Sequence, residues 1–217
     1  MQRKRLNGVL APAATPFAAT GDVAAAALMA NARAHLASGL AGIVVTGSSG
    51  EAPLLGEEER LVVVDAARAA VPEDRWLIAG IGAESTRLTI ARARSAAQRG
   101  ADLVLVVSPH YYGAGVLSAE ALRAHYLRVA DASPVPVLLY NIPKFAHLVL
   151  EPALVRQLAQ HDNIVGMKDS AGDLDRLDGY LDAQGDDFTV LTGHAPTLSR
   201  AIAMGARGAI LAVSLFA

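Results

Sequence analysis

The stretch Arg99-Gly-Ala-Asp-Leu-Val-Leu-Val106 joins the end of a helix-like segment to one glycine and then to an apolar run of leucine and valine. Two other stretches have the same arrangement, Ser38-Gly-Leu-Ala-Gly-Ile-Val-Val45 and Met204-Gly-Ala-Arg-Gly-Ala-Ile-Leu211. Glycine suits the left-handed residue that ends many helices, and an unbroken apolar run suits a strand that is buried on both faces. The pattern predicts parallel strands, each entered from a preceding helix.

Apolar runs of this kind recur along the whole chain. Eight strands are expected, at Gly8–Ala13, Ile43–Thr46, Trp76–Gly80, Leu103–Ser108, Val135–Tyr140, Ile164–Lys168, Phe188–Thr192 and Ala209–Val213. Amphipathic segments such as Glu57–Ala70 and Ser118–Ala130 separate them, and capping residues precede several helices, at Asp22, Ser85 and Ser118. Since no Gly-x-Gly-x-x-Gly follows the first strand, a (β/α)8 TIM barrel, formed as a single domain over residues 1–217, is favoured over an open doubly wound sheet.

The end of the chain is unusual for this fold, because the sequence stops after the eighth expected strand. The eighth helix and any further C-terminal helical region are therefore expected to be missing. Two interpretations stay open: a partner subunit covers the exposed flank of the first and last strands, or the chain is a fragment.

Composition excludes several classes of function. The 217 residues carry 19 Lys and Arg against 21 Asp and Glu, a formal charge of −2, so no basic excess supports nucleic-acid binding. The absence of cysteine excludes thiolate nucleophiles and cysteine-bound metals.

The basic start, residues 1–5, loosely resembles a signal peptide, but Pro12 and Pro16 interrupt the apolar region after it. No run approaches the roughly 18 apolar residues of a membrane helix, so a cytoplasmic protein is expected.

Lys168 stands out because the chain has only three lysines, the others being Lys4 and Lys144, against sixteen arginines. It follows the apolar run Ile164–Met167, so its amine is expected at the end of a buried strand. Arginine keeps its proton in proteins, whereas a desolvated lysine can lose it, and the neutral amine can attack a carbonyl group to form a Schiff base. The alternative is a strand-end lysine whose ammonium group simply reaches solvent.

Other unusual residues fall at the carboxyl ends of the expected strands, where the active sites of such barrels lie. Two serines between glycines, in Gly47-Ser-Ser-Gly50, can form a turn whose N–H groups bind a carboxylate, or an ordinary loop. Tyr112 and Tyr140 can exchange protons or merely pack. Taken with Lys168, these residues predict a site for a 2-oxo acid. No cofactor is expected, and no metal, since the six histidines show no paired ligand spacing.

Six separated motifs resemble the dihydrodipicolinate synthase / N-acetylneuraminate lyase family of class I aldolases over almost the whole chain. They are Ala14-Thr-Pro-Phe17, Gly47-Ser-Ser-Gly-Glu51, Tyr111-Tyr112, Tyr140-Asn-Ile-Pro143, Gly166-Met-Lys-Asp-Ser170 and Gly205-Ala-Arg-Gly-Ala-Ile210. The resemblance implies that Lys168 forms a Schiff base with pyruvate and that Tyr140 moves protons above it. It also implies that Ser48 relays protons and, with the backbone of Ser49, holds the pyruvate carboxylate.

The same resemblance implies further contacts and an assembly. Tyr112 is the position that completes the proton relay across a dimer interface, so a homo-oligomer, a dimer or a tetramer, is expected. Substrate contacts are implied for Gly47, Ser170 and Ile210. The expected partners are therefore a small 2-oxo acid, an aldehyde and further copies of the chain, with no membrane and no nucleic acid.

The substrate is less closely indicated than the reaction class. The synthases carry an arginine two residues after the proline of Tyr140-Asn-Ile-Pro143, where this chain has Phe145, preceded by Lys144. The stretch Asn163-Ile-Val-Gly-Met-Lys-Asp-Ser-Ala-Gly-Asp173 is similar to 4-hydroxy-2-oxoglutarate aldolases. Cleavage of 4-hydroxy-2-oxoglutarate to pyruvate and glyoxylate is therefore expected, with a synthase, a sugar-acid aldolase or an inactive 2-oxo-acid-binding barrel as alternatives. The role of His194 stays open.

Overall fold

The computed structural model describes residues 6–216. The basic start of the chain, including Lys4, lies outside the described residues, as does residue 217. Within the described range, no helix is both long enough and apolar enough to cross a lipid bilayer.

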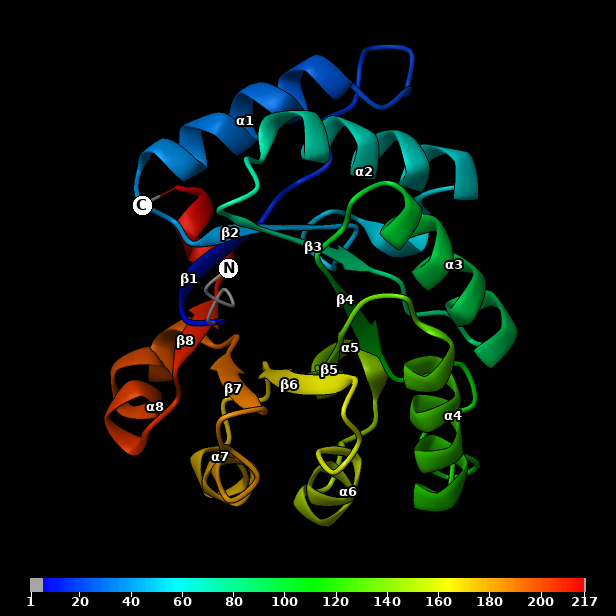
Figure 1. The fold of residues 1–217 in the computed structure, drawn as a ribbon, viewed down its shortest axis with the longest axis vertical. Coiled ribbons are helices and arrows are strands. Elements are labelled where there is room, and N and C mark those ends of the chain that lie inside the picture. Colours follow the sequence, from blue (N-terminus) through cyan, green and yellow to red (C-terminus); the bar gives the residue numbers. More distant parts are fainter. Residues whose placement is uncertain (1–5, 217) are drawn as a thin grey trace.

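Eight parallel strands close into a barrel in sequence order, with β8 pairing back onto β1 (Figure 1). The strands are β1 (Gly8–Pro12), β2 (Gly42–Val45), β3 (Trp76–Gly80), β4 (Leu103–Val107), β5 (Val137–Asn141), β6 (Ile164–Asp169), β7 (Thr189–Thr192) and β8 (Gly208–Ile210). The predicted (β/α)8 barrel is confirmed, and most predicted strand ends lie within two residues of the observed ones.

The eighth strand is shorter than predicted. We expected Ala209–Val213, but β8 ends at Ile210 and residues Ala212–Leu215 form the short 3-10 helix η3. The last paired residues of β8 are Ala209 with β7 and Ile210 with β1. On one side β7 ends at Thr192, the partner of Ala209, so β8 has no further strand partner there, although β1 continues to Pro12 on the other side.

Helices surround the barrel on its outer face (Figure 1). They are α1 (Ala25–Ala37), α2 (Glu57–Ala70), α3 (Thr86–Gln98), α4 (Ala119–Ala132), α6 (Pro152–Leu158), α7 (Leu174–Leu181) and α8 (Leu198–Met204), with short pieces at α5 (Pro143–Ala146), η1 (Ala52–Leu54) and η2 (Ala195–Thr197). In the described residues, β8 is followed by η3 rather than by an α-helix.

The predicted caps are correct at two helices and wrong at one. Ser85 accepts a hydrogen bond from Leu88 N at 3.2 Å, and Ser118 accepts one from Ala121 N at 3.1 Å. Asp22 does not cap α1, which begins at Ala25 with Ala24 before it. The Asp22 carboxylate instead accepts from the Thr20 hydroxyl at 2.7 Å, and Val23, which forms an isolated bridge with Phe17, separates it from the helix.

The alternation of strand side chains decides what reaches the interior of the barrel. Leu138 and Tyr140 on β5 belong to the apolar cluster inside the barrel, whereas Leu139 belongs to the layer between barrel and helices. Tyr140 is in register with Lys168 on β6, and Asn141 with Asp169. Because side chains alternate along a strand, the first pair faces inward and the second faces the helices.

Candidate active site

Lys168 and Tyr140 form a contact at the carboxyl ends of β5 and β6. The Lys168 side chain is 6% exposed, and its Nζ donates a hydrogen bond to Tyr140 Oη at 3.2 Å. The same nitrogen lies 4.3 Å from the centre of the Tyr140 ring. Among the described residues, no carboxylate lies within ion-pair distance of Lys168. A primary amine is therefore held among apolar side chains, with a phenol hydroxyl as its hydrogen-bond partner.

A second hydroxyl extends this contact toward solvent. Ser48 Oγ lies 3.4 Å from Tyr140 Oη, and either atom can be the donor. Ser48, Tyr140 and Lys168 therefore form one chain of polar atoms that leads from the surface to the buried amine. Hydroxyl groups both donate and accept hydrogen bonds, so such a chain can carry a proton in either direction.

The turn after β2 presents free backbone donors. Gly50 N and Ala52 N both donate to Gly47 O, at 3.1 and 3.2 Å, which closes the turn. Within the part of the chain that the structure describes, the N–H groups of Ser48 and Ser49 donate no hydrogen bond. Successive unpaired N–H groups in a tight turn are a common anion site in proteins. The serine turn predicted from the sequence therefore has the donors that a carboxylate needs.

A cleft of about 730 Å³ opens beside these groups. Its wall includes Gly47 and Ser48 from the turn, Tyr140 from β5, and the side chains of Phe145, Arg60 and His110. Lys168 does not line this cleft itself, but it is hydrogen-bonded to Tyr140, which does. Among residues 6–216, no group of three or more His, Asp or Glu side chains is placed to hold a metal ion.

Ser170 directly follows β6, and its hydroxyl lies near the Lys168 side chain and Gly193, the residue after β7. A Cβ added to Gly193 would overlap Ser170 Oγ and come within 2.7 Å of Lys168 Cε. Ser170 and Lys168 therefore both reach the space above the bare backbone of Gly193. His194 follows directly, with its ring against the backbone of Gly172 and its Nδ1 3.0 Å from Thr197 Oγ1.

The remaining predicted residues fall in different places. Ile210 is fully buried on β8, in the apolar cluster inside the barrel. Tyr112 is 67% exposed and packs edge-on against Tyr111, with ring centres 5.1 Å apart. It is not among the residues that line the cleft of its own chain. The single chain thus brings together Lys168, Tyr140, Ser48 and Ser170, but not Tyr112.

One polar network was not assigned a role from the sequence. Asn141 Nδ2 donates to Asp169 Oδ1 at 2.7 Å and lies 3.3 Å from Tyr180 Oη, and Leu150 N donates to Asn141 Oδ1 at 3.1 Å. Burial raises the pKa of the Asp169 carboxyl group, an effect that the hydrogen bond from Asn141 opposes. Burial also raises the pKa of Tyr180. These groups lie directly behind Tyr140 and Lys168 and join β5 to β6, so they fix the register of the reactive pair.

The barrel and its rim place the chain among (β/α)8 enzymes that act at the carboxyl ends of their strands. A model of the dihydrodipicolinate synthetase family matches residues 5–217. The chain belongs to this family, and the resemblance inferred from its motifs is confirmed.

Named relatives carry two different activities. The chain is 37% identical over 210 residues to the 4-hydroxy-tetrahydrodipicolinate synthase of Xanthomonas axonopodis pv. citri, covering 96% of this chain and 68% of the relative. It is 39% identical over 213 residues to a probable mitochondrial 4-hydroxy-2-oxoglutarate aldolase of Emericella nidulans, covering 96% and 69%. The family and these names indicate a lyase or aldolase and leave the particular substrate open.

The fold agrees with solved structures of the family. The chloride-inhibited dihydrodipicolinate synthase from Acinetobacter baumannii, complexed with pyruvate, superposes with a TM-score of 0.92 at 32% identity. The superposition covers 97% of this chain and 72% of that one.

Proposed function

We propose that the protein is a class I aldolase in which Lys168 forms a Schiff base with a 2-oxo acid. The substrate we propose is 4-hydroxy-2-oxoglutarate, or a similar 4-hydroxy-2-oxo acid, cleaved reversibly to pyruvate and glyoxylate or another aldehyde. The main support is the chain of polar atoms from Ser48 through Tyr140 to Lys168, beside the unpaired N–H groups of the serine turn.

In the first stage, the neutral Lys168 amine attacks the keto carbon. The new C–N bond forms as the carbonyl oxygen takes up protons through Tyr140, and this oxygen leaves as water, giving a protonated imine. The substrate carboxylate is held by the N–H groups of Ser48 and Ser49, with Gly47 and Ile210 shaping the site. Binding of the carboxylate fixes the position of the keto carbon relative to the amine. This positioning lowers the barrier to the attack of the amine.

In the second stage, Tyr140 removes the proton of the 4-hydroxyl group, with Ser48 as its relay. The C3–C4 bond breaks, the aldehyde departs, and the bonding pair moves into the protonated imine to give an enamine. Protonation at C3 and hydrolysis of the imine then release pyruvate and restore the Lys168 amine. Ser170 binds the part of the substrate that becomes the aldehyde, a role supported by the position of its hydroxyl near the Lys168 side chain.

Borohydride trapping tests this proposal directly, since only three lysines have to be distinguished. Reduction in the presence of pyruvate should add the mass of a reduced adduct to Lys168 and leave the exposed Lys144 unmodified. The Lys168→Ala variant should form no adduct and release no pyruvate from 4-hydroxy-2-oxoglutarate. An adduct that persists in this variant would refute the assigned role.

A synthase is the second candidate within the family, supported by the Xanthomonas relative. Against it, Phe145 lies in the cleft wall where the synthase pattern has an arginine. A positive charge does lie beside Phe145, since Lys144 Nζ is 5.4 Å from its ring centre. Measuring condensation of pyruvate with a panel of aldehydes separates the two, because a synthase should reject glyoxylate.

We also propose that a second copy of the chain supplies Tyr112 to the proton relay. Tyr112 and its neighbours Tyr111 and Val116 are strongly exposed in the single chain, as is Leu54 at the cleft. A homo-oligomer would bury such a patch. Native mass spectrometry should show a dimer or tetramer, and Tyr112→Phe should lower turnover. A fully active monomer would contradict the proposal, while a protein without turnover would favour the inactive, 2-oxo-acid-binding alternative.

A further inference from the structure

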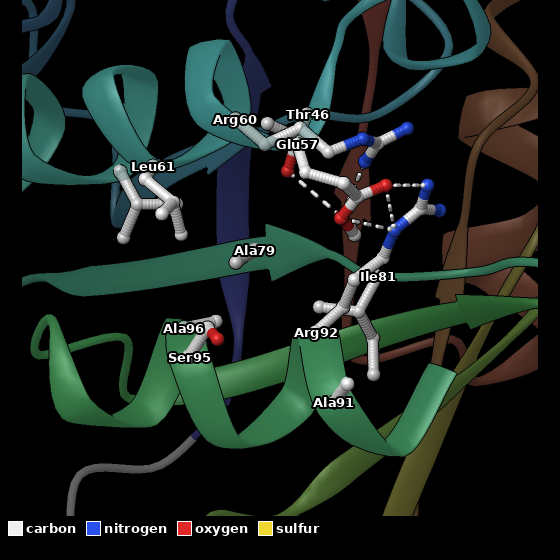
Figure 2. Close-up of a pocket in the computed structure, with 12 residues that line it drawn as sticks. Thr46, Glu57, Arg60, Leu61, Ala79, Ile81, Ala91, Arg92, Ser95 and Ala96 are labelled. Carbon is white, nitrogen blue, oxygen red and sulfur yellow. Dashed lines mark hydrogen bonds and ion pairs between the residues drawn. The ribbon is translucent and has the colours of Figure 1, made fainter. Parts of the chain in front are cut away.

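Arg60 is a buried arginine behind the serine turn. It lies on α2, its side chain is turned toward the end of β3 (Figure 2), and the residue is only 7% exposed. Its Nη2 donates to Ala52 O, and its Nη1 lies 3.5 Å from Gly80 O. Its Nε is buried and has no hydrogen-bond partner among residues 6–216. Arginine is rarely buried without a carboxylate partner, so this arrangement requires a reason.

The nearest carboxylate is engaged elsewhere. Glu57 accepts two hydrogen bonds from Arg92 Nε, each of 3.1 Å (Figure 2). Arg92 Nη1 also donates to Gly82 O. Burial lowers the pKa of Arg60 to about 10, with a further decrease from the charge of Arg92. Structural ion pairing therefore does not explain Arg60, whose hydrogen-bond partners among the described residues are both backbone carbonyls.

Ala52 O stands at the end of a strained turn that runs from Thr46 to Ala52, whereas Gly80 O lies at the end of β3, within hydrogen-bond distance of Thr46 at the start of that turn. Thr46 begins the turn with φ of 50°, and Glu51 stands near its end with φ of 56°. Positive φ is uncommon outside glycine and is an outlier for a β-branched residue such as threonine. Thr46 Oγ1 donates to Gly80 O at 2.8 Å, the same oxygen that faces Arg60, while Ala52 O closes the other end.

We propose that Arg60 is a positioning residue that clamps the turn from Thr46 to Ala52, so that the N–H groups of Ser48 and Ser49 stay directed at the carboxylate of the substrate. The inference rests on the proposed function, because it takes the ligand of the turn to be a 2-oxo acid. Strained backbone persists only where its surroundings hold it, and Arg60 donates to Ala52 O in the turn and to Gly80 O, the β3 oxygen that also accepts from Thr46 Oγ1. Arg60 also lines the cleft itself, so its charge makes that wall attractive to an anion.

The test compares a carbonyl compound that has a carboxylate with one that lacks it. Borohydride trapping at Lys168 is measured against pyruvate concentration and against propanal concentration in the wild type, Arg60→Met and Arg60→Lys. We expect the half-saturating pyruvate concentration to rise about tenfold or more in Arg60→Met, because misplaced donors bind poorly. Trapping of propanal, which has no carboxylate, should need the same concentration in Arg60→Met as in the wild type. Arg60→Lys should resemble Arg60→Met, since one ammonium group cannot reach two carbonyls as a guanidinium does.

Arg68 provides a matched control on the same helix. Its guanidinium also binds two carbonyls, Gly100 O and Val71 O, and it does not line the cleft. Arg68→Met should therefore lower the melting temperature and leave pyruvate trapping unchanged. If Arg60→Met does not fold, Arg60→Lys decides the outcome.

Two results would overturn the inference: pyruvate half-saturation that is unchanged in the Arg60 variants, or pyruvate and propanal trapping that weaken together. Failure of the proposed function is a separate result, because it would show as no pyruvate adduct in the wild type.

Discussion

The Lys168–Tyr140 pair and the Thr46–Ala52 turn lie at the same rim of the barrel but are held by different means. The pair stands on two strands in register, with the Asn141–Asp169 hydrogen bond directly behind it. The turn lies outside the ladders, and its backbone conformation is unfavourable at Thr46 and Glu51. Side chains on a rigid sheet need little further support, whereas backbone donors in a loop depend on a few specific contacts such as those of Arg60.

The largest effect is expected from a change in the Lys168–Tyr140 pair, the part of the site that stands on strands. Tyr140→Phe removes the hydroxyl that joins Lys168 to Ser48 and leaves the ring in place. Because general acid–base catalysis typically contributes about 10²–10⁴-fold, kcat for pyruvate release should fall by that amount. Thermal unfolding should change little, since the ring keeps its packing. Unchanged kcat would show that Tyr140 carries no proton in the reaction.

Gly193→Ala is expected to act next most strongly. The added methyl group would occupy the space that Ser170 Oγ and Lys168 Cε use, and both side chains would have to move. Displacements of about 1 Å at a reacting centre can lower rates by about 10²-fold, so a loss of that order in kcat is expected. Gly185→Ala is the control, because its Cβ meets nothing within 4 Å. Equal kinetics for the two variants would exclude the steric explanation.

A smaller contrast separates the two serines. Ser48→Ala loses the hydroxyl that faces Tyr140, so turnover should fall about tenfold. Ser49→Ala should change turnover and pyruvate half-saturation by no more than about twofold, because the proposed contribution of Ser49 is its backbone N–H. Steady-state kinetics of both variants check this. A large loss in Ser49→Ala would mean that its side chain, rather than the turn, binds the carboxylate.

The smallest expected effect concerns stability and pH. Burial raises the pKa of Asp169 in the folded protein. The folded protein therefore binds a proton at this carboxyl group more tightly than the unfolded chain does. The stability linked to Asp169 is therefore fully present below its usual pKa and is lost as the pH rises through the raised value. Relative to Asp169→Asn, the wild type should gain melting temperature as the pH falls from about 7 to about 4. Parallel melting curves would refute this.

The sequence predicted those features of the fold and the site that depend on one local segment. The apolar runs indicated eight strands, and the residues at their carboxyl ends indicated Lys168, Tyr140 and the serine turn. The early end of β8 could not be predicted, because it depends on where the neighbouring strand β7 stops. The partners of Arg60 belong to residues 8 and 20 positions away, and sequence spacing on α2 does not reveal them.

Residues with polar side chains on the outer face of a strand were also hard to interpret. Asn141 and Asp169 were visible within the motifs around Tyr140 and Lys168, but their roles depend on Tyr180, which lies on α7. Tyr112 shows the opposite case, since it was selected by resemblance and lies exposed in the single chain. Its assigned role stays a prediction that only an assembled oligomer can test.

The closure of the barrel is uneven, and this has a consequence for its opening motions. At the seam, β7 pairs with β8 only through Leu191 with Gly208 and Thr192 with Ala209, whereas β5 and β6 are paired from Val137 to Asn141. Native-state hydrogen exchange follows such local stability. Amide protons of β8 should therefore exchange first and those of β5 and β6 last. Lys168 on β6 would then keep its pairing with β5 during fluctuations that open the seam between β7 and β8.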